Sequence, residues 1–143
     1  MNDSSFEECV ANNHAITITS DNAKVSSLLS TSKKRMDYLR TLAINQSSAN
    51  FIFEGMYAST LELLHALVLI DGYAISNHLC LGFYLRDVLQ KQSLFRKFDD
   101  VRIKRNKLTY YGKIMDFEVA QEAIEKSISL NNELIDLIDV KTD

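Results

Sequence analysis

The sequence contains no proline and only four glycines among its 143 residues. Both residue types interrupt regular structure, so their scarcity favours long helices and argues against a turn-rich β-sandwich. Cysteine is scarce too: Cys9 and Cys80 form no CxxC motif, and two cysteines make no disulfide framework. We therefore expect two reduced thiols in a cytoplasmic protein, with Cys80 packed in the core as a small hydrophobic side chain.

Signals for secretion and for a membrane are lacking as well. The first 14 residues, MNDSSFEECVANNH, contain neither the basic nor the apolar region of a signal peptide. The most apolar run, Leu61–Ile70, is too short to cross a bilayer and is interrupted by His65. The net charge of −3 argues against non-specific nucleic-acid binding by bulk electrostatics. These features predict a protein without a membrane segment. Any nucleic-acid binding would have to come from a local basic patch and not from the overall charge.

The residues that are present suit one helical domain. Hydrophobic residues make up 46% of the chain and charged residues 24%, which is enough apolar material for a core in a domain of this length. We expect an all-α fold, an up-and-down bundle of four to five helices formed by residues 20–143. Residues 1–19 are polar and aperiodic, and we expect an N-terminal arm outside the core, free to be flexible. Within it, Ile16 and Ile18 alternate with threonines and fit a short extended stretch, and His14 has no recognisable role.

Apolar residues at steps of three and four predict the helices. The helices are expected over about residues 21–43, 48–70, 77–91, 93–111 and 116–138. Ser20 or Asp21 is expected to cap the first, Ser76 the third, and Gly112 to end the fourth. The short loops between the later helices predict antiparallel neighbours. The second helix is apolar on most sides, so we expect it to be surrounded by the others.

The fourth predicted helix has an arginine at a position where its line of apolar residues predicts a hydrophobic side chain. This apolar seam is Phe98, Val101 and Leu108, and Arg105 lies four residues after Val101 and three before Leu108. Arginine stays charged in proteins, so a buried guanidinium needs a partner. One interpretation is a core ion pair with a carboxylate of the second helix, either Glu54 or Glu62.

The other interpretation is a phosphate-binding surface. Arg102 lies one turn before Arg105 and Asn106, and Tyr110 lies one turn after Asn106 on the same side. Guanidinium groups match the geometry of phosphate with two parallel hydrogen bonds. Spacing alone leaves both interpretations open.

The run from Phe98 to Lys113 resembles the motif helix of the HEPN family. That motif is an arginine, commonly followed by a small polar residue such as asparagine, with a histidine four to six residues beyond; Arg105-Asn106 matches its first part. Residues 54–73 and Ser76–Leu81 resemble the same family, so the likeness covers about residues 21–138. The resemblance implies a four- to five-helix bundle and a homodimer that pairs the motif helices. It also implies a metal-independent endoribonuclease, often a toxin or an antiviral defence protein beside a small nucleotidyltransferase partner.

The chain departs from this motif at the histidine, because Tyr110 stands where the histidine is expected and Tyr111 follows it. A phenol is a poor base at neutral pH but can still donate a hydrogen bond to a phosphate oxygen. The sequence therefore favours a HEPN-like module that binds a nucleotide, an RNA or a partner protein and carries a degenerate ribonuclease motif.

Two alternatives to this binding module stay open. The first is a surviving metal-independent endoribonuclease, of toxin–antitoxin or defence type, in which Tyr110 or His78 assists Arg105. The second is a structural homodimer with no ligand. Three scattered histidines make a zinc site unexpected, and no cofactor is predicted. The candidate catalytic residues are Arg105, Asn106 and Tyr110, and the candidate ligand-binding residues are Arg102, Tyr111 and His78.

Overall fold

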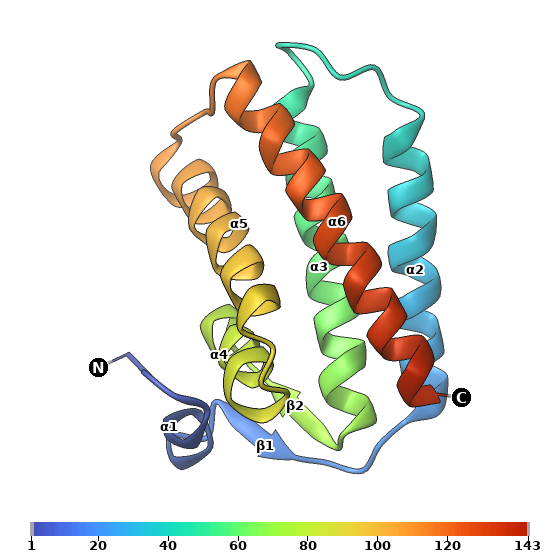
Figure 1. Ribbon diagram of the computed structural model, residues 1–143, viewed down its shortest axis with the longest axis vertical. Coiled ribbons are helices and arrows are strands. Elements are labelled where there is room, and N and C mark those ends of the chain that lie inside the picture. The colour runs from blue at the N-terminus through green and yellow to red at the C-terminus, as the bar shows by residue number, and fades with distance from the viewer. Residues whose placement is uncertain (1, 143) are drawn as a thin grey trace.

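The computed structural model describes residues 2–142, and it is predominantly helical, as predicted. Four long helices run alternately up and down (Figure 1). Two short helices, α1 and α4, lie near one end of the molecule, and α4 continues into a π-helical turn, η1 (Tyr84–Val88). The α-helices are α1 (Phe6–Ala11), α2 (Asn22–Arg40), α3 (Ala49–Ile70), α4 (His78–Phe83), α5 (Gln92–Tyr111) and α6 (Phe117–Thr142).

Some helix ends follow the local signals of the sequence. Asp21 caps α2, where its side chain accepts a hydrogen bond from the backbone amide of Lys24. Gly112 ends α5 in the left-handed conformation, with φ of 63°. The predicted cap of the third helix was wrong: the side chain of Asn77, not Ser76, accepts a 2.7 Å hydrogen bond from the amide of Cys80. That helix also ends earlier than predicted, because the α-helix gives way to η1 after Phe83.

Helix α3 is the centre of the bundle and makes its most extensive contacts with α2 and α6. Its length and composition would allow it to cross a membrane, but 67% of its most apolar window is buried inside the protein. Polar groups on α3 are matched by neighbours: Glu62 forms an ion pair with Arg35 of α2, and the Thr60 hydroxyl donates to Asn131 of α6 at 2.6 Å. Helix α3, which is apolar on most sides, is therefore surrounded by other helices, as its composition predicted.

Residues 2–19 do not stand apart from the core. Phe6 is buried, and strand β1 (Ala15–Thr17) pairs antiparallel with β2 (Tyr73–Ile75), with Ala15 opposite Ile75 (Figure 1). The extended stretch expected there is present, but its pairing partner could not be read from the sequence. The predicted arm is thus packed against the end of the bundle where α3 finishes and α4 begins.

The expectation of two reduced thiols was wrong. Cys9 of α1 and Cys80 of α4 form a disulfide with a Cα–Cα distance of 6.0 Å. Both residues are fully buried, as expected for Cys80. The two cysteines face each other because the strand pair brings α1 beside α4, an arrangement that no local sequence signal reveals.

Candidate functional site

Arg105 lies on α5 between two aromatic rings. Phe98 and Val101 of the same helix are fully buried, and Arg105, next on that seam, is half-buried. Its guanidinium carbon is 5.4 Å from the centre of the Tyr57 ring and 5.6 Å from that of Tyr110. Both distances are within the range of a cation–π interaction. The arginine at the apolar seam is therefore accommodated by aromatic faces.

The predicted core ion pair of Arg105 is not formed. Glu62 is bound instead by Arg35, and among residues 2–142 no carboxylate lies within 4.0 Å of the Arg105 guanidinium. Rings satisfy the face of a guanidinium but not the N–H donors at its edge. Arg105 thus keeps hydrogen-bonding capacity for an anion.

Tyr57 connects Arg105 to His78. Its ring is buried on α3 and stacks on Phe98 at 6.1 Å, and its hydroxyl shares a 3.1 Å hydrogen bond with His78 Nδ1. Burial raises the pKa of Tyr57 well above its usual range, against the opposing effect of Arg105. Burial also lowers the pKa of His78, with a further contribution from Arg105. Both groups are therefore neutral at pH 7, beside a cation.

Arg102 faces a neighbouring hollow. Its guanidinium donates to Asp99 one turn earlier, at 2.8 Å, and it helps to line a cavity of about 300 Å³. The opposite wall comes from the N-terminal segment, with Asp3 and His14. Hydrogen bonds from Asn12 and His14 hold the pKa of the Asp3 carboxyl below its usual range. His14 had no recognisable role in the sequence, since only the tertiary fold brings it near α5.

The structure brings some of the predicted site residues together and leaves others apart. Arg105 contacts Tyr110 directly and is connected to His78 through Tyr57. Tyr111 is 73% exposed at the end of α5, and Asn106 is half-buried beside Arg105. Tyr57 is the residue that sequence reasoning missed as part of the site. In the sequence, Tyr57 is one apolar position among many on a buried helix. A single sequence cannot distinguish a tyrosine that supports a site from one that only packs in the core.

Chemically, the cluster offers one cation with free donors, one exposed aromatic ring and one neutral imidazole. These groups can bind an anion such as a phosphate and can, through the imidazole, accept a proton. No family model, curated protein or solved structure matches the chain, so the HEPN resemblance and the functions that it implies stay predictions.

Proposed function

We propose that this chain is a HEPN-like binding module that holds a phosphate group of RNA or of a nucleotide on the exposed side of α5. The observation that carries the proposal is Arg105, which is held between two rings and has no carboxylate partner in residues 2–142. A guanidinium fixed in this way is preorganised for a phosphate, because its side chain has already lost its conformational freedom before the ligand binds.

The surroundings of Arg105 suit a nucleic acid. Tyr110 is 68% exposed and next to the guanidinium, so a base could stack on its ring. Helix α5 carries six basic and two acidic residues, although the whole chain has a net charge of −3. In the described part of the chain, three of the six basic residues make no ion pair: Arg96, Arg105 and Lys107.

Binding of a labelled single-stranded RNA, followed by fluorescence anisotropy, tests the proposal. We expect Arg105→Ala to weaken binding by about 10- to 100-fold, because a charged hydrogen bond contributes about 1.5–3 kcal/mol. The wild-type affinity should fall with salt. Inorganic phosphate and a mononucleotide, used as competitors, separate recognition of phosphate alone from recognition of a base. The matched control is Arg40→Ala, which removes an exposed arginine of α2 that is paired with Asp37. Equal losses in both variants, or no binding by the wild type, would contradict the proposal.

The endoribonuclease alternative is favoured by one observation, the neutral His78 connected to Arg105 through Tyr57. A neutral imidazole could take the proton of a ribose 2′-hydroxyl while the arginine stabilises the phosphorane. The same RNA, incubated with the protein in EDTA, should then yield cyclic phosphate ends. Cleavage should be lost in both Arg105→Ala and His78→Ala. Binding without cleavage leaves the binding module as the better description.

A homodimer through α5 is part of this proposal. Large apolar side chains are exposed at the end of α5 and just after it, with Tyr111 at 73% and Ile114 at 74%. We expect the protein to sediment as a dimer at micromolar concentration, and Ile114→Glu to shift it to a monomer, since a buried charge opposes association. The control Val140→Glu changes a residue of α6 that is also 74% exposed. A monomeric wild type would refute the dimer, and a dimer that binds no RNA would favour the purely structural alternative.

A further inference from the structure

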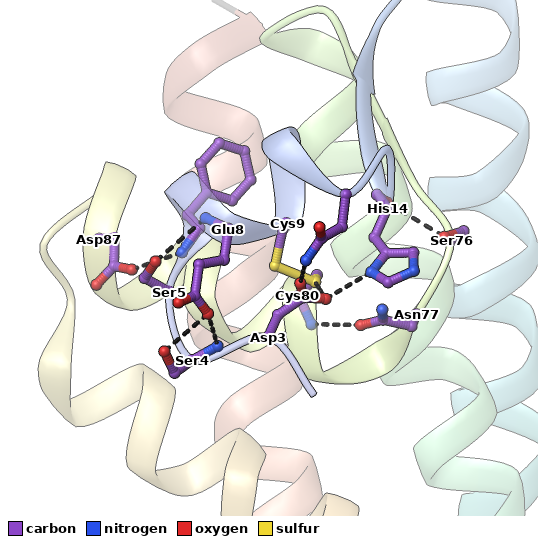
Figure 2. The surroundings of a disulfide bond; sticks show 12 residues. Asp3, Ser4, Ser5, Glu8, Cys9, His14, Ser76, Asn77, Cys80 and Asp87 are labelled. Atoms are coloured by element: carbon purple, nitrogen blue, oxygen red, sulfur yellow. Dashed lines mark hydrogen bonds and ion pairs between the residues drawn. A yellow bond between two sulfur atoms is a disulfide. The ribbon is translucent and has the colours of Figure 1, made fainter. Parts of the chain in front are cut away.

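A cluster of metal-ligating side chains surrounds the disulfide. Asp3, His14 and Cys80 each offer a ligand atom, and these atoms all lie within 4.8 Å of one another. Asp3 Oδ2 is 2.5 Å from His14 Nδ1 and 3.3 Å from Cys80 Sγ. Figure 2 shows the carboxylate between the imidazole and the sulfur pair. Cys9 Sγ lies outside this group of three but is bonded to Cys80 Sγ, so it would be the nearest further donor atom once that bond is opened.

The donor set is that of a zinc site. Two thiolates, one imidazole and one carboxylate suit Zn²⁺ in tetrahedral geometry. Zinc bonds of about 2.0–2.3 Å place tetrahedral ligands about 3.3–3.8 Å apart. The separation of 3.3 Å between Cys80 Sγ and Asp3 Oδ2 already falls in that range. The imidazole nitrogen and the carboxylate oxygen would move apart by less than about 1 Å to reach this range.

These ligands come from two segments that are held together without the sulfur–sulfur bond. The amide of Ser76 donates to the carbonyl of His14 at 2.8 Å, and the strand pair continues from there. The amide of Phe6 donates to the Asp87 carboxylate at 2.9 Å, and Arg86 donates to the carbonyl of Ser4. Because these contacts do not involve the disulfide, we expect them to keep Asp3, His14 and Cys80 close together after reduction.

We propose that, once the disulfide is reduced, the protein binds one Zn²⁺ through Cys9, Cys80, His14 and Asp3. A dithiol or phosphine reductant supplies two electrons, and the disulfide takes them up with two protons to give two thiols. Binding of Zn²⁺ then releases those two protons to water as the thiolates coordinate the metal, and the hydrogen between His14 Nδ1 and Asp3 Oδ2 passes through water to His14 Nε2. A peroxide then takes two electrons from the two thiolates and is reduced with two protons from water, while the sulfur–sulfur bond forms again and the ion is released. The proposal does not depend on the function proposed for α5.

The surroundings of the cluster support a metal in this position. Asn12 Nδ2 donates to Asp3 Oδ1 at 2.7 Å, in the manner of an outer-shell hydrogen bond, and the ion would replace the hydrogen that lies between Asp3 Oδ2 and His14 Nδ1. Asp3 is buried, whereas the side chain of His14 is 42% exposed. An ion can therefore reach the cluster from the side on which the His14 imidazole is exposed. Calcium and magnesium are disfavoured, because they prefer sets of oxygen ligands.

The test uses the full chain, reduced with a phosphine that is removed under argon before metal is added. Titration with Co²⁺ should give a thiolate-to-metal charge-transfer band and a tetrahedral spectrum at one ion per chain, and Zn²⁺ should displace the cobalt. The disulfide form should give no such band. We expect His14→Gln and Asp3→Asn each to weaken Zn²⁺ binding by at least about 10-fold, and Asn12→Ala by about 10- to 100-fold. The matched control, His65→Gln, removes a half-buried histidine of α3 and should bind like the wild type.

Two results would overturn the proposal. One is a reduced wild type that binds Zn²⁺ no better than the disulfide form. The other is wild-type affinity in both His14→Gln and Asp3→Asn, which would assign the binding to thiols alone. If the reduced chain loses helical circular dichroism, the readout becomes its recovery on addition of Zn²⁺. Recovery that is lost in His14→Gln supports the site, and no recovery in the wild type refutes it.

Discussion

Reduction of the bond between Cys9 and Cys80 is expected to lower the free energy of unfolding by about 2–5 kcal/mol in metal-free buffer. The two cysteines are 71 residues apart, and closing a loop of that length lowers the conformational entropy of the unfolded chain by an amount worth about 4–5 kcal/mol. Urea unfolding of the oxidised and the reduced protein, each followed by circular dichroism, measures the difference. A loss of this size is a large fraction of the stability of an ordinary domain.

The double variant Cys9→Ser/Cys80→Ser is the control for effects of the reductant itself. Its unfolding midpoint should be the same with and without reductant and should lie near that of the reduced wild type. If reduction leaves the midpoint of the wild type unchanged, the bond does not constrain the unfolded chain in solution. Added Zn²⁺ should raise the midpoint of the reduced wild type only, because binding to the folded state stabilises it.

Replacement of Tyr57 by alanine should have the second large effect, a loss of about 3–5 kcal/mol. The Tyr57 ring is fully buried, packs on Phe98, and supports both Arg105 and His78. Alanine leaves a cavity at the centre of the bundle and removes the ring on which the guanidinium rests. Urea unfolding measures the stability, and RNA anisotropy of the folded fraction should show weaker binding as well.

Tyr57→Phe separates the ring from its hydroxyl. We expect it to cost only about 0.5–1.5 kcal/mol, because it removes one hydrogen bond and keeps the stack and the cation–π contact. The control Tyr38→Ala, at a residue of α2 that is 64% exposed, should stay within about 0.5 kcal/mol of the wild type. If Tyr57→Phe were as unstable as Tyr57→Ala, the hydroxyl and not the ring would account for most of the contribution of Tyr57 to stability.

Much of the helical framework could be predicted because its signals are local. Asp21 caps α2 through its own side chain, and Gly112 adopts a positive φ that other residues avoid. The apolar character of residues 49–70 likewise predicted a surrounded helix, since burial on most sides needs no knowledge of its partners. The cap of α4 was misplaced by one residue, because Ser76 and Asn77 are both good capping types.

Partner choice, in contrast, depends on the tertiary fold. The half-buried Arg105 needed a partner, and the sequence offered two carboxylates of α3 as candidates. In the structure Glu62 is taken by Arg35, and the faces of Tyr57 and Tyr110 accommodate Arg105 instead. In the same way, two cysteines 71 residues apart gave no sign that β1 and β2 would bring them together. The candidate site was therefore predictable as a set of residues on α5, but its aromatic support and its N-terminal neighbours were not.

The disulfide also determines how the chain transmits a mechanical load. Residues 9–80 form a closed covalent ring that contains α2, α3 and both strands. When the two ends of the protein are pulled apart, the tension crosses the sulfur atoms and bypasses everything inside that ring. About 250 Å of contour length, at about 3.3–3.6 Å per residue, stays hidden from the force. Of the residues that the structure describes, only 2–8 and 81–142, which include η1, α5 and α6, can be extended until a reductant opens the ring.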